Sequence, residues 1–176
     1  AAINEVLNDS LTVLLLDKDD LLADLPAASD LDYRVQTPAE LEYASCCNNF
    51  WWCLQNVGKG LVRNEIPYAM MMYHCVVRKE LHDMIAWFIN GVYKKPIDSG
   101  KFGKFFKEYL PDSLYQQYLK TYSDTHSGSL WSSVLEMAQL FSTLAKAVGD
   151  AFNYTYAEDD EKNIVDYLLQ LRLESK

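Results

Sequence analysis

Apolar residues recur at spacings of three and four along most of the chain after residue 40, which is the pattern of amphipathic helices with one buried face. The clearest such stretch predicts a long helix from Arg63 or Asn64 to Asn90, closed by Gly91. Pro67 would fall in its first turn, where the missing amide costs little. The apolar stripe consists of Ile66, Met70, Tyr73, Val77, Leu81, Met84, Trp87 and Phe88.

An earlier helix has the strongest start signal in the sequence. Thr37 is a candidate N-cap, Pro38 stands at the first helical position, and Glu40 follows three residues after the cap. We expect this helix to end near Asn56, because glycines follow it at positions 58 and 60. Three further helices are predicted after residue 111, over residues 131–149 and after residue 158, the last with acidic residues in its first turn.

A short helix is also expected after Ser99, which could cap it. Lys101, Lys104 and Lys107 would then lie along one side of this helix. Lysines beside a helix N-terminus are a candidate anion site, since the terminal amides and the side chains attract the same charge.

The N-terminal region differs from the rest. Leu11 to Leu16 form a short apolar run bounded by charge, which reads as a buried strand. Up to residue 36 no period is sustained, so this region reads as a linker. We therefore predict a mostly α fold: residues 1–36 as strand and linker, and residues 37–176 as a bundle of about five or six helices with mostly antiparallel neighbours. An unpaired strand is an open edge, so self-association through it is one expectation and packing as an arm is the other.

Composition agrees with a compact protein that can bury a core, since 49% of the 176 residues are hydrophobic. There is no apolar run of 18 residues and no signal-peptide layout, so we expect a cytoplasmic protein with no membrane partner. The four cysteines and three histidines lack ligand spacing, which indicates neither a disulfide framework nor a metal site.

The net charge of -9 argues against a general nucleic-acid binder. Residues 1–42 hold ten acids and two bases, residues 43–107 four acids and nine bases, and residues 108–176 eleven acids and five bases. A basic middle thus lies between two acidic ends. A phosphate ligand would favour the basic middle, and a polycation would favour the acidic ends. The alternative interpretation is that these charges only cover the solvated faces of helices.

Four segments together resemble a known family. They read C-C-N-N-F-W-W at 46–52, K-G-L-x-R-x-E-I-x-Y-A at 59–69, S-G-K at 99–101 and K-T-Y at 120–122. In this order and spacing they are similar to aminoglycoside 6-adenylyltransferases, also called streptomycin adenylyltransferases. The likeness extends from about residue 16 to about residue 167 but covers only the back half of that family.

The resemblance implies the C-terminal part of a polymerase-β-like nucleotidyltransferase. In the family, a preceding domain with a G-S motif and three aspartates holds Mg and ATP, and an aminoglycoside hydroxyl attacks the α-phosphate. That set is not recognisable in this sequence, so we expect the chain alone to be inactive, without catalytic residues, bound cofactor or metal. A free-standing helical binding or interaction module derived from the family is the alternative.

Two lysines are the first candidates for nucleotide phosphates. Lys59 stands between glycines that would let backbone approach a ligand, and Lys101 stands at the expected helix start after Ser99. Tyr122 joins them through the K-T-Y resemblance, although a tyrosine in an apolar stripe is commonly a core residue. The second choices are Arg63, Lys104 and Arg78.

The adjacent tryptophans are the candidates for the aminoglycoside. Trp51 and Trp52 are consecutive, so on a helix they point about 100° apart, and one should be core while the other borders a cleft. Glu65 could pair with a drug ammonium. At Asn49 the resembling family usually has glutamate, and an amide can neither hold an ammonium by charge nor take a proton at neutral pH.

Overall fold

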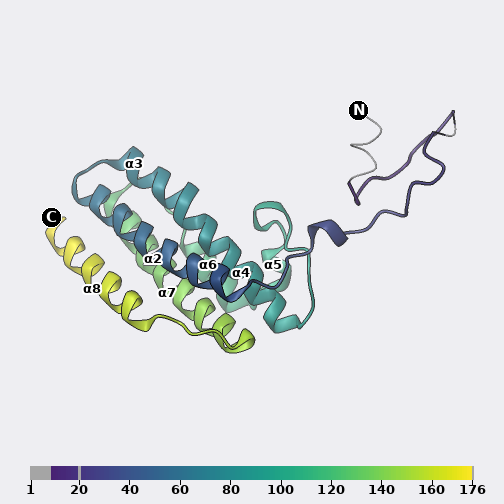
Figure 1. The fold of residues 1–176 in the computed structure, drawn as a ribbon. Coiled ribbons are helices and arrows are strands. Elements are labelled where there is room, and N and C mark those ends of the chain that lie inside the picture. The colour runs from purple at the N-terminus through teal and green to yellow at the C-terminus, as the bar shows by residue number, and fades with distance from the viewer. Residues whose placement is uncertain (1–8, 20, 176) are drawn as a thin grey trace.

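The computed structural model describes residues 9–19 and 21–175, and within them all regular structure is helical (Figure 1). In chain order the elements are η1 (Leu31–Tyr33), α2 (Glu40–Val62), α3 (Ile66–Met71), η2 (Met72–Val77), α4 (Arg78–Tyr93), η3 (Lys101–Gly103), α5 (Phe106–Tyr109), α6 (Asp112–Lys120), α7 (Ser127–Phe152) and α8 (Glu158–Glu174). The predicted helical bundle is confirmed.

Helix α7 forms the centre of the bundle, since it packs against α2, α4, α6 and α8. Its Phe141 ring stacks on Phe50 of α2 with the ring centroids 3.6 Å apart, and Trp51 meets the same ring edge-on at 5.8 Å. All three side chains are fully or almost fully buried. Aromatic burial of this size fixes how α2 lies against α7.

Helix α2 begins two residues later than the start predicted from Thr37 and Pro38. Its N-cap is Ala39, whose backbone N–H donates to the Glu42 carboxylate at 2.7 Å. The glutamate three residues after the cap is therefore Glu42 and not Glu40. The sequence analysis did not indicate this start, because alanine has no side-chain acceptor to mark it as a cap.

Helix α2 also continues past the two glycines that were expected to end it. A Cβ added to Gly58 would lie 2.7 Å from Leu168 Cδ2 on α8, and one on Gly60 would lie 3.0 Å from Ala69 Cβ on α3. Both positions are buried. The glycines therefore allow neighbouring helices to approach α2 closely, which a local sequence pattern cannot distinguish from a helix end.

The predicted long helix is confirmed as one continuous run of α3, η2 and α4 with Pro67 in its first turn. It has two features that the sequence did not indicate. The six residues of η2 form a π-helical turn. The helix also passes through Gly91 and ends at Tyr93, where Lys94 takes the left-handed conformation.

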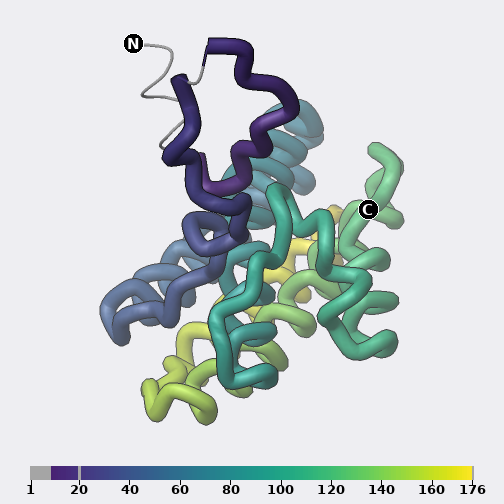
Figure 2. Tube along the Cα trace, turned by 90° about the vertical axis from the view of Figure 1, so that its right-hand side faces the viewer, coloured from purple at the N-terminus to yellow at the C-terminus, as the bar shows by residue number. Residues whose placement is uncertain are grey.

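The predicted N-terminal strand is wrong. In the described residues from 9 onward no strand is present, and the apolar side chains of the run are exposed, Leu15 by 92%. This segment leads away from the bundle in Figure 1 and folds back as a loop in Figure 2. The loop is closed by the Ser29 backbone N–H, which donates to the Ser10 carbonyl at 2.7 Å. A strand needs a neighbouring strand for its backbone groups, and the described residues form none beside this run. Self-association through this segment stays a prediction.

We predict that Gly60→Val lowers the free energy of unfolding by about 1–3 kcal/mol, because the added methyl groups would overlap Ala69 on the packed face of α3. Gly128→Val is the matched control, since a Cβ on that helical glycine would meet only two His126 ring atoms, at 3.6 and 3.7 Å. The measurement is urea unfolding of both variants. Equal stability of the two variants would contradict the close-packing role of Gly60.

Candidate functional site

Two adjoining cavities line the outer side of α4. The larger, of about 840 Å³, lies between α4 and the segment from Ser99 to Phe106. The smaller, of about 410 Å³, lies between α4, the first half of α2 and residues 35–38. We call them together the α4 groove. The residues that border both cavities are Val35, Lys79, Asp83 and Trp87.

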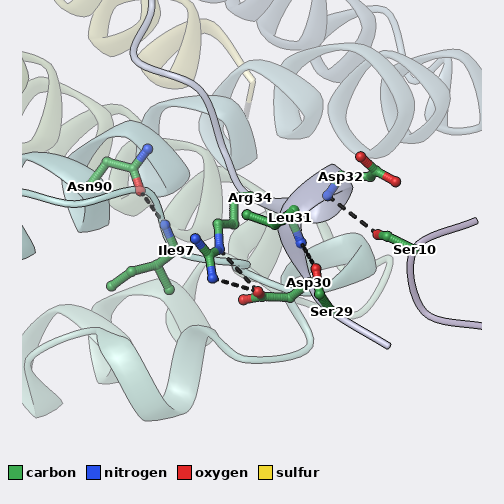
Figure 3. A network of polar contacts seen from close by, with 8 residues as sticks. All are labelled: Ser10, Ser29, Asp30, Leu31, Asp32, Arg34, Asn90 and Ile97. Carbon is green, nitrogen blue, oxygen red and sulfur yellow. Dashed lines mark hydrogen bonds and ion pairs between the residues drawn. The ribbon is translucent and has the colours of Figure 1, made fainter. Parts of the chain in front are cut away.

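The rim of the groove is fixed by a polar clamp at the end of α4. The buried Asn90 side chain donates to the Val35 carbonyl at 2.6 Å and accepts from the Ile97 backbone N–H at 3.1 Å. The Val35 N–H also donates to the Ile97 carbonyl at 3.1 Å. Figure 3 shows the Asn90–Ile97 contact and, beside it, the ion pair between Arg34 and Asp30 at 2.7 Å. Val35 is therefore held through its carbonyl by Asn90 of α4 and through its N–H by the Ile97 carbonyl.

The inner wall of the larger cavity contains a buried guanidinium. Arg78 is 5% exposed and donates to the Thr121 hydroxyl and carbonyl, both at 2.9 Å, and to His74 Nδ1 at 3.3 Å. Its guanidinium carbon lies 3.8 Å from the ring centroid of Tyr122, a cation–π distance. Arg78 opens α4, directly after the π-helical turn, and so joins α4 to the end of α6.

Hydrogen bonds continue from Tyr122 across the wall. The Tyr122 and Tyr118 hydroxyl oxygens are 2.7 Å apart, and the Tyr118 hydroxyl lies 2.9 Å from His82 Nε2. Burial is the main cause that lowers the pKa of His82 to about 4, with the charge of Arg78 adding to it. Burial and Arg78 likewise lower the pKa of His74. Both imidazoles are therefore neutral at pH 7.

The smaller cavity has the opposite chemistry. Asn49, Glu42 and Glu80 line it, and burial raises the pKa of the Glu80 carboxyl. Asp83 is held by Lys79 at 2.7 Å. The α4 groove thus has the Arg78 guanidinium at one end and the Glu42 and Glu80 carboxylates at the other, with the Lys79–Asp83 ion pair bordering both cavities.

Two of the three predicted nucleotide residues lie next to lining residues of the groove, although neither of them lines it. Tyr122, 46% exposed, stacks on Arg78, and Lys101 lies in η3 between the lining residues Gly100 and Phe102. Lys59 is elsewhere, on the side of α2 that faces α8, where its ammonium contacts Gln55 and lies 6.0 Å from the Tyr167 ring centroid.

The expected helix after Ser99 does not form as predicted. A three-residue turn (η3) and a four-residue helix (α5) take its place, Phe102 adopts a positive φ of 58°, and Ser99 makes no side-chain cap. The three lysines therefore do not share one helix N-terminus.

One tryptophan is buried and the other exposed, as predicted, but neither lines the α4 groove. Trp51 is 2% exposed and its indole N–H donates to the Tyr156 hydroxyl at 3.1 Å, whereas Trp52 is 65% exposed. Glu65 is the exposed N-cap of α3, beyond the end of α2. Since a helix rises 1.5 Å per residue, Trp52 lies roughly 15 Å along α2 from Val62. The structure does not bring Trp52 and Glu65 to one place.

The described residues also allow two negative findings. Within residues 9–19 and 21–175, no group of three or more His, Cys, Asp or Glu side chains is arranged to hold a metal ion. No helix in the same part of the chain is long and apolar enough to cross a membrane.

Comparison with known proteins identifies the relatives of this fold. The family model described as Streptomycin adenylyltransferase matches residues 1–171. Aminoglycoside 6-adenylyltransferases from Campylobacter jejuni and Bacillus subtilis (strain 168) are 36% and 35% identical over 92% and 88% of this chain, and the matches cover 56% and 54% of their own lengths. The crystal structure of an aminoglycoside 6-adenyltransferase from Bacillus subtilis superimposes with a TM-score of 0.72 at 33% identity, over 81% of this chain and 54% of that one.

An all-helical bundle with a groove of mixed charge thus has its relatives among nucleotidyltransferases. The chain belongs to the streptomycin adenylyltransferase family. It spans about half the length of the curated relatives it matches.

We predict that acid destabilises the fold through His82. Its pKa is about 4 in the fold against 6.5 for an ordinary imidazole, so between these values the unfolded chain takes up a proton that the folded chain refuses. The stability present above pH 6.5 should therefore fall as pH drops from about 6.5 to about 4. Urea midpoints of the wild type and of His82→Gln should show a flatter dependence in the variant.

His126→Gln is the matched control, because that exposed imidazole lies away from the groove at the start of α7. It should keep the wild-type dependence. Identical pH profiles of His82→Gln and His126→Gln would contradict the assignment.

Proposed function

We propose that this chain is the C-terminal helical part of an aminoglycoside 6-adenylyltransferase, in which the α4 groove is the surface that closes on nucleotide and aminoglycoside. The proposal is carried by the polarity of this groove. A buried guanidinium with Tyr122 and Lys101 nearby suits a phosphate group, and the Glu80 end suits an ammonium group. The same relatives that share the fold are named for transfer to aminoglycosides.

In this proposal the residues of this chain bind and orient the nucleotide and the aminoglycoside. The metal-dependent chemistry belongs to the additional domain found in the family. Magnesium would offset charge on the triphosphate when bound there. Lys101 and Tyr122 contact the nucleotide from the α4 groove. The chain alone then transfers no AMP, because its described residues hold no carboxylate cluster for a metal.

For the aminoglycoside, the exposed Trp52 offers a flat ring to a sugar or ammonium group, worth about 0.5–2 kcal/mol. Trp51 is buried in the core and offers no ring face to the drug. Glu65 and Lys59, which lie away from the groove, act as outer contacts to the drug and to the nucleotide if the additional part of the protein reaches them.

A second function, a non-catalytic binding module, is favoured by one observation. Asn49 lines the smaller cavity of the groove, at the position where the family pattern has glutamate. If that glutamate takes the proton of the attacking hydroxyl, Asn49 would remove activity while leaving the fold and the groove intact.

A chimera tests the proposal. Residues 37–176 of this chain replace the matching region of the Bacillus subtilis relative, which is 35% identical to it. We expect the chimera to transfer labelled AMP from ATP to streptomycin, and the 176-residue chain alone to transfer none, because the chimera regains the metal-binding part.

Asn49→Glu in the chimera separates the two functions. An inactive chimera that becomes active with Asn49→Glu would favour the binding module for the natural chain. A folded chimera that stays inactive with either residue, measured beside the active relative, would contradict the proposed transferase role.

A further inference from the structure

Arg78 carries a charge that its surroundings do not balance. In the described part of the chain it is 5% exposed, and no carboxylate lies within ion-pair distance of it. Taking an ion out of water costs several kcal/mol unless an opposite charge or strong hydrogen bonds offset the loss. The neighbouring carboxylate Asp83 is already held by Lys79 at 2.7 Å.

The contacts of Arg78 are all to neutral groups. Its acceptors are the hydroxyl and carbonyl of Thr121 and the Nδ1 atom of His74. The rings of Tyr122 and Tyr73 lie 3.8 and 5.2 Å from its guanidinium carbon. These bonds engage all three guanidinium nitrogens, and Arg78 also hydrogen-bonds with the Tyr73 and Tyr118 hydroxyls. Every one of these partners is neutral, so the positive charge itself is not balanced within the described residues.

The guanidinium is also held in one orientation. Thr121 fixes two of its nitrogens, the Tyr122 ring lies against it, and the π-helical turn before it positions its backbone. A planar donor group that is fixed before a ligand arrives loses little entropy on binding. Fixed guanidinium donors are the arrangement that recognises carboxylate and phosphate oxygens.

Arg78 opens onto the larger cavity of the α4 groove. The volume of about 840 Å³ exceeds that of a simple ion and suits a ligand of nucleotide size. Trp87, Phe102 and Phe106 give that cavity flat apolar walls. A ligand that fills it would therefore combine an anionic group with an organic ring.

We propose that Arg78 is the centre of an oxyanion site that takes a phosphate group of a nucleotide from the α4 groove, with Thr121 and Tyr122 as its positioning residues. The nucleotide part of this inference rests on the proposed function, whereas the oxyanion site does not. The phosphate oxygens lie against the guanidinium and balance its charge, and the organic part of the ligand lies against the apolar wall.

The test uses the whole 176-residue chain with inorganic pyrophosphate and with ATP as probes, followed by calorimetry at low and moderate salt. We expect both probes to bind, with affinity that falls as salt rises. Arg78→Gln should weaken the binding of both probes at least tenfold. Arg78→Lys should retain part of the wild-type affinity, because lysine keeps the charge but lacks the planar pair of guanidinium N–H donors. Arg172→Gln, which removes an exposed arginine of α8, is the matched control and should bind as the wild type does.

Because a substitution at a buried site can unfold the protein, a second measurement uses the wild type alone. Pyrophosphate should shift the side-chain Nε–H resonance of Arg78 in a nitrogen–proton NMR spectrum and leave that of Arg172 in place. An unmoved Arg78 resonance at saturating pyrophosphate and ATP would overturn the proposal, as would equal binding by Arg78→Gln in a folded state.

The two proposals fail separately. An inactive chimera together with pyrophosphate binding at Arg78 would remove the transferase role and keep the oxyanion site. An active chimera together with a silent Arg78 would do the reverse.

Discussion

The buried hydrogen bonds around Thr121 determine how η2 and α4 pack against α6 and α7. The carbonyl of this fully buried residue accepts from the Tyr73 hydroxyl at 2.6 Å and from Arg78 at 2.9 Å, and its hydroxyl accepts from Arg78 and donates to the Tyr118 carbonyl at 2.7 Å. Tyr73 also lies 2.9 Å from the Ser133 carbonyl of α7. One residue at the end of α6 thus ties together η2, α4, α6 and α7. Leaving any of these buried polar groups without a partner would be costly. The hydrogen bonds of Thr121, Tyr73 and Arg78 therefore restrict how these helices can pack.

That junction also explains why the groove has its polarity. The π-helical turn lies directly between Tyr73 and Arg78, and irregular turns of this type are common at functional sites. With Arg78 committed to Thr121, its charge faces one end of the groove and adds to burial, the main cause, in lowering the pKa of the nearby imidazoles. The carboxylate of Glu80, two residues further along α4, faces the other end. A single helix therefore presents opposite charges to two adjoining cavities.

The helices could be predicted from the sequence because their apolar periodicity is long and regular, and the family could be predicted from four short motifs. The errors came from interactions beyond the local pattern. Leu11 to Leu16 look like a strand by composition, but the described residues form no strand beside them. Gly58 and Gly60 look like a helix end, and only the closeness of α3 and α8 shows their role.

The site shows the same division. Arg78 was only a second choice as a phosphate contact, because a basic residue next to Val77 within an apolar stripe gives no local sign of what it contacts. Its role became visible only when α6 placed Thr121 and Tyr122 beside it. Lys59 had the more suggestive sequence context and lies on another face of α2. The sequence around Arg78 adds no such signal, because Lys79 and Glu80 follow it directly and the three together read as a solvated charged run.

The central claim is that the α4 groove is the ligand-binding face of this chain. Amide hydrogen exchange of the 176-residue protein, with and without saturating Mg-ATP, tests it most directly. The account predicts slower exchange in residues 78–87, 99–106 and 121–122, with no change in α8. Protection confined to α8 or to the α2–α8 face around Lys59, with residues 78–87 unchanged, would contradict it.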